Sequence, residues 1–218
     1  MTVELKLTYQ DFSGIALANF GDISQCTASG KISGGWARGG IVSSNLGTIT
    51  DCVNNIDFSD GYYGLTGGIV IYNDGGEVLD CANNGDLIST SDDTGTTAYG
   101  GIIARMYNGT ISGCVNNGDI RIAAAAVGGI VGNAGNWSGE DKTCIITNCS
   151  NTGNIEGLYD SPTGGIIGVL DGEDSEMTGC TYGGTVNGVA GDATNAIGED
   201  MRSTSNDANI NDIPTEEW

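Results

Sequence analysis

Aromatic and acidic side chains occur together in segments that interrupt an otherwise regular sequence. A ring can stack on the C–H face of a sugar while a carboxylate accepts hydrogen bonds from its hydroxyls, and Tyr and Trp are also favoured in protein interfaces. These residues predict a surface that binds a glycan or a host or cell-surface protein. The alternative is that the rings pack over the fold and hold their own loops in place. The candidates are Trp36, Tyr62, Tyr63, Tyr99, Tyr159, Asp60, Asp92, Asp93 and Asp160.

A second group of carboxylates follows at residues 171–176. Oxygen ligands suit Ca²⁺, so Asp171, Glu173, Asp174 and Glu176 are the weak calcium candidates of the chain. Their spacing does not match an EF-hand loop, and a solvated acidic turn explains them better. We therefore expect no metal and no cofactor, with calcium as the one exception to test.

Catalysis finds little support in the residue types. The chain has no histidine, which excludes Ser-His-Asp and Cys-His mechanisms and zinc sites that use imidazole. Parallel β-helices can carry lyases and hydrolases that use grouped acids, for which Asp51 and Asp80 are the candidates. Gly113 and Gly179 occupy the same position elsewhere in the chain, which indicates turn chemistry. We expect no enzymatic activity, and a polysaccharide lyase or hydrolase remains the less favoured reading.

The composition limits the partners. There are 28 acidic and 7 basic residues, a formal net charge of −21. Such a charge repels polyanions, so neither nucleic acid nor a bare anionic lipid surface is an expected partner. No apolar run approaches the ~18–20 residues that a membrane-spanning helix needs, and we expect no membrane insertion.

The elements that must position these side chains are set by an internal repeat. A Gly-Gly-Ile triplet recurs five times, and residues 13–15 form a degenerate first copy. One cysteine follows each of the six copies. The triplets begin at Gly39, Gly67, Gly100, Gly128 and Gly164. The cysteines are Cys26, Cys52, Cys81, Cys114, Cys149 and Cys180, separated by 26 to 35 residues. A fixed pattern with variable insertions is typical of a solenoid.

Two apolar columns keep the same distance from the cysteine. Three residues before it stand Ile23, Ile49, Val78, Ile111, Ile146 and Met177. Six residues after it stand Ile32, Phe58, Leu87, Ile120, Ile155 and Val186. Short β-branched segments around these columns and after Gly-Gly predict three strands per coil, with glycine or asparagine at the corners of a roughly triangular outline. Equivalent strands would stack in parallel ~4.8 Å apart.

Asparagine and cysteine also repeat in register. Asn54, Asn83, Asn116 and Asn151 share one column, which favours a ladder of amides that stabilises the corners over a ligand site. Six cysteines in one inward column predict buried free thiols, because in-register Cβ vectors make the disulfide torsion hard to reach. Cys144 stands outside that column, where it could be exposed or pair with Cys149, and we expect it to be free.

The segment from Gly100 to Ile120 resembles the GLUG repeat, and the resemblance extends over about residues 14–198. GLUG repeats occur in large bacterial secreted or cell-wall proteins, including adhesin-like and IgA-protease-type ones. The resemblance implies an accessory region outside the cell or on the bacterial surface. The long insertions at residues 89–99 and 136–143 depart from the usual pattern, so particular function is expected in such insertions.

The predicted fold is an all-β, single-stranded parallel β-solenoid of about six three-strand coils, right-handed by the rule for parallel crossovers. Residues 1–13 form an N-terminal strand or cap, 14–198 the solenoid and 199–218 an acidic tail. The connections at 33–38, 59–66, 89–99, 123–127 and 156–163 should gather along one edge. The predicted function is a non-catalytic binding or adhesion module, monomeric as an isolated domain. The alternative is a structural spacer.

Overall fold

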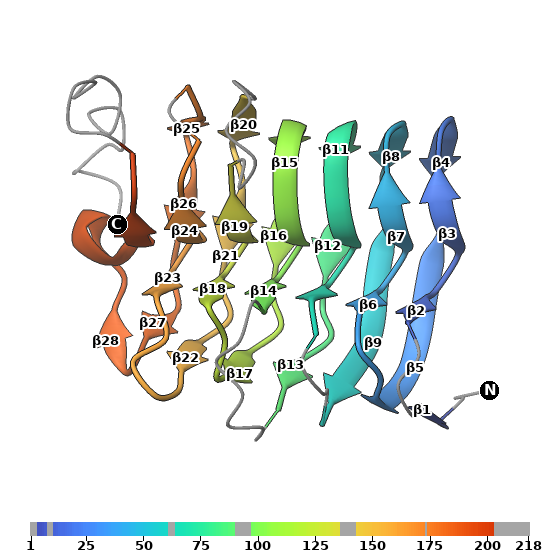
Figure 1. Cartoon of the computed structure of the whole chain (residues 1–218), viewed down its shortest axis with the longest axis horizontal. Coiled ribbons are helices and arrows are strands. Elements are labelled where there is room, and N and C mark those ends of the chain that lie inside the picture. The colour runs from blue at the N-terminus through green and yellow to red at the C-terminus, as the bar shows by residue number, and fades with distance from the viewer. Residues whose placement is uncertain are drawn as a thin grey trace.

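The computed structural model describes residues 4–7, 11–60, 64–89, 97–135, 143–172 and 174–202. Its strands stack side by side along one axis, from the N-terminal coil to the C-terminal coil (Figure 1). Apart from the antiparallel pair β27–β28, every strand pair within the described part of the chain is parallel. The chain is therefore a parallel β-solenoid of about six coils, as the repeat predicts.

Three sheets run along the stack. The first sheet contains β1 (Glu4–Leu7), β5 (Thr27–Gly34), β9 (Val53–Ser59), β12 (Ala82–Asn83), β13 (Leu87–Ile88), β16 (Val115–Asn116), β17 (Ile120–Ile122), β21 (Ser150–Asn151), β22 (Ile155–Gly157), β26 (Thr181–Tyr182), β27 (Thr185–Val186) and β28 (Val189–Ala190). The second sheet contains β2 (Phe12–Ser13), β6 (Arg38–Gly39), β10 (Thr66–Gly67), β14 (Ala98–Gly100), β18 (Ala126–Gly128) and β23 (Thr163–Gly164).

The third sheet follows each Gly-Gly pair and precedes each cysteine. It contains β3 (Ala16–Asn19), β4 (Asp22–Ser24), β7 (Val42–Asn45), β8 (Thr48–Thr50), β11 (Val70–Leu79), β15 (Ile103–Ser112), β19 (Val131–Ala134), β20 (Cys144–Thr147), β24 (Ile167–Leu170), β25 (Glu176–Thr178) and β29 (Ile197–Asp200). A short 3-10 helix, η1 (Ala193–Asn195), precedes β29. No helix in the described part of the chain is long and apolar enough to cross a bilayer.

Both predicted apolar columns are confirmed. Ile49 lies beside Val78, and Val78 beside Ile111, in successive coils of the third sheet. Phe58 lies beside Leu87 in the first sheet in the same way. Each of these five side chains is at most 1 % exposed. A coil therefore buries its apolar residues against the coils on either side of it.

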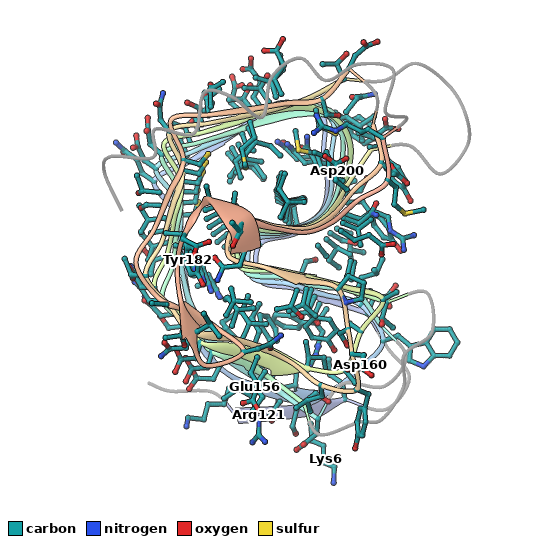
Figure 2. The ribbon with its side chains drawn as sticks, turned by 90° about the vertical axis from the view of Figure 1, so that its left-hand side faces the viewer. Lys6, Arg121, Glu156, Asp160, Tyr182 and Asp200 are labelled. Atoms are coloured by element: carbon teal, nitrogen blue, oxygen red, sulfur yellow. The ribbon has the colours of Figure 1, made fainter. Side chains whose placement is uncertain are left out.

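The cross-section is indented, where a roughly triangular outline was expected. Figure 2 looks along the stack and shows the chain fold inward on one side, turn, and run outward again. The second sheet runs inward, the third sheet runs outward, and the Gly-Gly pair forms the turn between them. The backs of these two sheets touch, because a Cβ on Gly132 would lie only 2.8 Å from the Tyr99 carbonyl oxygen.

The tip of this inward fold meets the asparagine column on the opposite wall. A Cβ on Gly101, the second glycine of its pair, would lie 2.7 Å from the Asn116 Cβ and would overlap the Gly129 carbonyl oxygen. The equivalent glycines Gly40, Gly68 and Gly129 face Asn54, Asn83 and Asn151 in the same way. Glycine is needed here because the two walls leave no room for a side chain.

The buried asparagines form the predicted ladder. The Asn54 amide donates to the Asn83 Oδ1 at 2.7 Å, Asn83 to Asn116 at 2.7 Å, and Asn116 to Asn151 at 2.8 Å. The Asn83 amide also donates to the Gly85 carbonyl oxygen at 2.9 Å. These amides are fully buried, so the ladder satisfies groups that would otherwise be costly to bury.

A second, shorter ladder lines the third sheet. The Asn19 amide donates to the Asn45 Oδ1 at 2.9 Å, and Asn45 donates to Asn73 at 2.8 Å. Asn108 and Asn133 are not part of this ladder, because Met106 takes the position beside Asn73 and Ala134 the position beside Met106. The amides give way to apolar residues in the later coils.

The two ends differ. Strand β1 pairs in parallel with β5, in the place that the third strand of a preceding coil would take. At the other end β29 pairs with β24, with Ile197 beside Ile167, so residues 197–200 begin a further coil. Tyr182 takes the ladder position beyond Asn151, and its ring would meet a Cβ on Gly165. The C-terminal coil thus departs from the repeat.

Replacing the tip glycine tests the inward fold. We expect Gly101→Ala to lower the free energy of unfolding by about 3 kcal/mol or more, because the added Cβ must push two backbone walls apart. The matched control is Gly21→Ala, at an exposed turn where no atom lies within 4 Å of the added Cβ. The control should change stability by less than about 1 kcal/mol. Urea unfolding measures the stability of both variants. Equal losses of stability for Gly101→Ala and Gly21→Ala would contradict the close contact between the inward turn and the opposite wall.

Adjacent asparagines test the ladder. Asn83→Ala should cost about 3 kcal/mol, because it leaves buried groups of Asn54, Asn116 and Gly85 without their hydrogen bonds. Asn84→Ala removes only exposed bonds to Asn55 and Asn117, so it should cost under about 0.5 kcal/mol. Thermal and urea unfolding of the two variants would disprove a stabilising ladder if they gave the same midpoint.

Candidate ligand-binding surface

The predicted site segments lie between the first sheet and the second sheet in each coil. The described parts of these connections end at the strand that runs inward, so they lie on the indented side of the solenoid. Figure 2 shows Asp160 on that side, where the chain turns inward. We call this side the indented face. It is the surface on which the predicted ligand-binding residues have to be placed.

Two of the predicted aromatics are exposed. The Trp36 side chain lies in the connection before β6 and is 50 % exposed, and Tyr159 lies in the connection before β23 and is 66 % exposed. Tyr159 and Asp160 both have left-handed backbone, with φ of 55° and 58°, and the Ser161 amide donates to the Leu158 carbonyl oxygen at 3.2 Å. This is a tight turn with a bulky residue in a conformation that usually costs ~1–2 kcal/mol.

The carboxylates at the same segments have a turn role. Asp60 is exposed, has φ of 49°, and its backbone amide donates to the Ile88 carbonyl oxygen at 3.2 Å. Aspartate is among the residues that tolerate this conformation best. Asp60 and Asp160 are therefore explained by local backbone geometry, and their side chains still point to solvent at the indented face.

Tyr99 is not part of a ligand surface, and that expectation is wrong. Its side chain is 2 % exposed, because it points inward from β14. Arg38, itself 1 % exposed, donates to the Tyr99 hydroxyl at 3.0 Å, to Thr66 Oγ1 at 2.9 Å and to the Ser59 carbonyl oxygen at 2.9 Å. Its guanidinium also lies 5.5 Å from the centre of the Phe58 ring. These neutral acceptors and π faces hold the buried cation.

The remaining aromatic and acidic candidates are not described. Tyr62, Tyr63, Asp92 and Asp93 lie outside the described residues, so they stay predictions. The structure thus supports Trp36 and Tyr159 as exposed aromatics of the indented face and removes Tyr99 from it.

The described members of the acidic run do not assemble a metal site. Asp171 is half-buried, Asp174 and Glu176 are exposed, and Glu173 lies outside the described residues. Among the residues that the structure describes, no three Cys, Asp or Glu side chains lie close enough together to hold a metal ion. Burial raises the pKa of the Asp171 carboxyl above its usual value, which Arg105 partly offsets. The observed arrangement is that of a partly buried surface turn.

The cysteines form the expected column of free thiols. All seven are free, and six are buried while Cys26 of the first coil is half-buried. The Cys52 amide donates to the Cys81 sulfur at 3.4 Å, and the Cys81 amide donates to the Cys114 sulfur at 3.4 Å. Cys144 is also free and buried, and its thiol donates to the Met106 carbonyl oxygen at 3.3 Å. The thiols fill the interior.

The residue before each cysteine of the column adopts left-handed backbone. This position is occupied by Gln, Asp, Gly or Asn because a tight corner with left-handed backbone favours or tolerates these residues. The φ values are 56° for Gln25, 54° for Asp51, 51° for Asp80, 66° for Gly113, 53° for Asn148 and 62° for Gly179. The two carboxylates singled out as candidate acids thus have a corner role.

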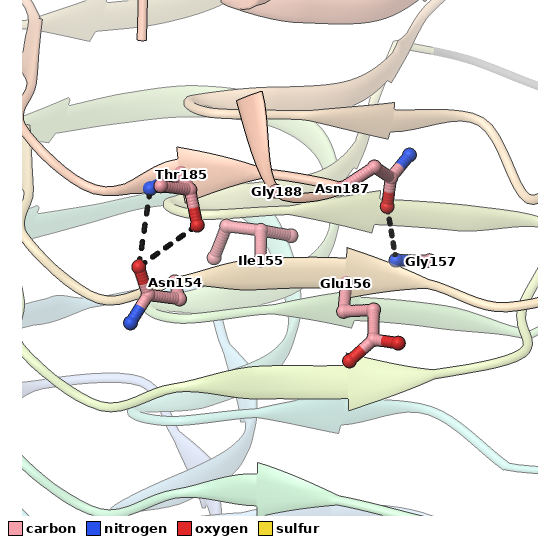
Figure 3. Close-up of a pocket in the computed structure, with 7 residues that line it drawn as sticks. All are labelled: Asn154, Ile155, Glu156, Gly157, Thr185, Asn187 and Gly188. Atoms are coloured by element: carbon pink, nitrogen blue, oxygen red, sulfur yellow. Dashed lines mark hydrogen bonds between the residues drawn. The ribbon is translucent and has the colours of Figure 1, made fainter. Parts of the chain in front are cut away.

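A shallow hollow of about 480 Å³ lies near the C-terminal coil. Figure 3 shows the Asn154 Oδ1 accepting from the Thr185 amide and hydroxyl, and the Asn187 Oδ1 accepting from the Gly157 amide at 2.9 Å. Glu156 pairs with Arg121 on the neighbouring coil at 2.9 Å. The polar groups of the hollow are engaged with one another between coils, so it is a weaker ligand site than the indented face.

One aromatic pair was missed by the sequence reasoning. Tyr72 of β11 and Tyr107 of β15 are half-buried, with ring centres 6.2 Å apart and ring planes only 3° from parallel. Tyr72 packs against a small outer apolar cluster between the second and third sheets. The available signal was a tyrosine shortly after Gly-Gly in two successive coils. It was hidden because the two tyrosines do not share a column: Tyr72 lies beside Arg105, and Tyr107 falls at the register shift between Met106 and Asn108.

The stacked parallel coils define the chain as a β-solenoid repeat protein. Residues 123–156 match a family model described as the GLUG motif, and this segment includes strands β18 to β21 and most of β22. The predicted resemblance is confirmed there, and the chain carries a GLUG motif. No curated protein and no solved structure gives a significant match to the chain.

Thiol reactivity tests the interior assignment. Six of the seven thiols are buried, which keeps reagents from them, and for Cys52 and Cys144 burial also raises the pKa to about 11, so that only about one in a thousand of these two thiols is ionised at pH 8. In the native protein at pH 8 we expect only Cys26 to react readily with a thiol reagent, and all seven to react in denaturant. Cys26→Ser should remove the native reaction. Disulfide-linked peptides in a digest, or several thiols that react rapidly in the native protein, would contradict a column of buried free thiols.

Proposed function

We propose that the chain is a non-catalytic binding module of a bacterial secreted or cell-surface protein, and that it binds its ligand at the indented face. The observation that carries the proposal is the exposed Tyr159 ring, which sits on left-handed backbone that a tyrosine adopts only at a cost. The turn sets the backbone conformation, but it does not call for a large exposed ring at this position. We infer that a tyrosine is kept there because its ring is presented to a partner.

Trp36 supports the same reading from another coil. It is half exposed in the connection equivalent to that of Tyr159, and both connections emerge from a rigid stack of coils. Binding residues are often found on loops held by a rigid scaffold, and Trp and Tyr contribute strongly to binding energy. The charge of −21 favours neutral or basic ligands over polyanions.

The spacer function remains the second candidate, and one observation favours it. The columns of Ile, Asn and Cys continue from coil to coil, so the solenoid is suited to hold other parts of a protein apart. A spacer does not require an exposed ring on costly backbone. An enzymatic function has the least support, because the candidate acids Asp51 and Asp80 are explained by the left-handed backbone of the corner before each cysteine.

A binding array with paired variants tests the proposal. The wild-type protein should bind at least one member of a panel of printed glycans and of matrix proteins such as collagen, fibronectin and laminin. The double variant Trp36→Ala, Tyr159→Ala should lose about tenfold or more in affinity, since each truncation removes an exposed ring of the binding face. Phe20→Ala is the matched control, because Phe20 is a 78 % exposed ring that follows β3 in the first coil and lies in none of the connections between the first and second sheets. Absence of binding to every probe would favour the spacer.

A further inference from the structure

We propose that Tyr72, Tyr107 and Arg105 form the ligand contact of the indented face, and that the ligand is a neutral glycan chain lying along the solenoid axis. This inference rests on the proposed binding function and names the site and the ligand class. It comes from three side chains in two neighbouring coils, none of them in the insertions to which the sequence assigned binding.

The two tyrosines form a stacked aromatic pair, which is the platform of the proposed site. They come from successive coils, with centres 6.2 Å apart and planes within 3° of each other. Both are half-buried, so each ring is held by its surroundings while part of it faces solvent. Tyr72 is further held by the outer apolar cluster, which contains Leu65 and Ile71. Rigid, amphipathic rings lose little conformational entropy on binding, which suits them to stack on sugars.

Polar groups converge on the same rings. Arg105 lies beside Tyr72 in register and two residues from Tyr107 along β15. Asp11, whose carboxylate accepts from the Ala37 amide at 3.1 Å, lies near enough to Tyr72 to act on the pKa of its phenol. A guanidinium and a carboxylate thus lie near the Tyr72 ring, and together with the phenol hydroxyls they are the kinds of donor and acceptor that sugar hydroxyls require.

The floor of the face argues for a glycan over a protein partner. The second and third sheets touch back to back, and the outer cluster between them consists mainly of small residues such as Ala98, Ala104 and Ala126. Protein hot spots sit in well-packed pockets that receive an anchoring side chain. The small, closely packed residues described here leave little room for an anchoring side chain, whereas a polymer can lie across exposed aromatic rings.

Charge and direction narrow the class further. The net charge of −21 disfavours polyanionic polysaccharides, so we infer a neutral chain. The platform extends from β11 to β15, which are neighbours along the stack, so the ligand should run with the axis.

The test is affinity electrophoresis, followed by titration calorimetry, on dextran, laminarin, xyloglucan and galactomannan. At least one should bind the wild-type protein. Tyr72→Ala and Tyr107→Ala should each weaken that binding about tenfold, while Tyr72→Phe and Tyr107→Phe, which keep the ring, should stay within about threefold. Phe20→Ala should leave the affinity unchanged. Slow native thiol reactivity of the variants shows that the coils remain folded.

The outcomes separate this inference from the proposed function. Binding of matrix proteins through Trp36 and Tyr159, with none of the four polysaccharides bound, would overturn the glycan site and leave a binding module. Polysaccharide binding that survives the Tyr72→Ala, Tyr107→Ala double variant would also overturn it. If the double variant loses binding while both phenylalanine variants keep it, the platform is supported.

Discussion

The structure depends on the contact between the Gly-Gly turn and the asparagine ladder. The second glycines Gly40, Gly68, Gly101 and Gly129 each touch an asparagine amide on the opposite wall, and these amides also bond to one another along the axis. This contact fixes how far the chain can fold inward. A larger residue at either position would move the two walls apart, and the second and third sheets could not keep their close back-to-back packing.

The same contact explains what could be predicted from the sequence. The columns of Ile49, Val78 and Ile111 and of Asn83 and Asn116 were predictable, because identical side chains stack when coils are in register. The inward fold was not predictable. Glycine and asparagine each have a sufficient local explanation as corner residues, and the contact that joins them pairs positions in different sheets whose separation the repeat does not encode.

The site was predicted less well than the fold, for reasons that can be named. Tyr99 was assigned to a loop as the last residue of the insertion at 89–99, but it lies in β14 beside Val127 and its side chain is buried. Tyr72 and Tyr107 were overlooked because they do not share a column, since Tyr72 lies beside Arg105 and Tyr107 falls at a register shift. Sequence spacing finds residues that repeat, and both errors concern residues that do not repeat.

This contrast indicates where function lies in such a fold. In the third sheet the inward column is uniform: Ala16, Val42, Val70, Ile103, Val131, Ile167 and Ile197. Two residues further on, the column that contains Tyr72 differs in every coil: Ala18, Ser44, Tyr72, Arg105, Asn133, Val169 and Glu199. Stacking constrains the first column to one kind of side chain. It leaves the second free to differ in each coil, so one stretch of the stack can carry an aromatic and basic surface that the others lack.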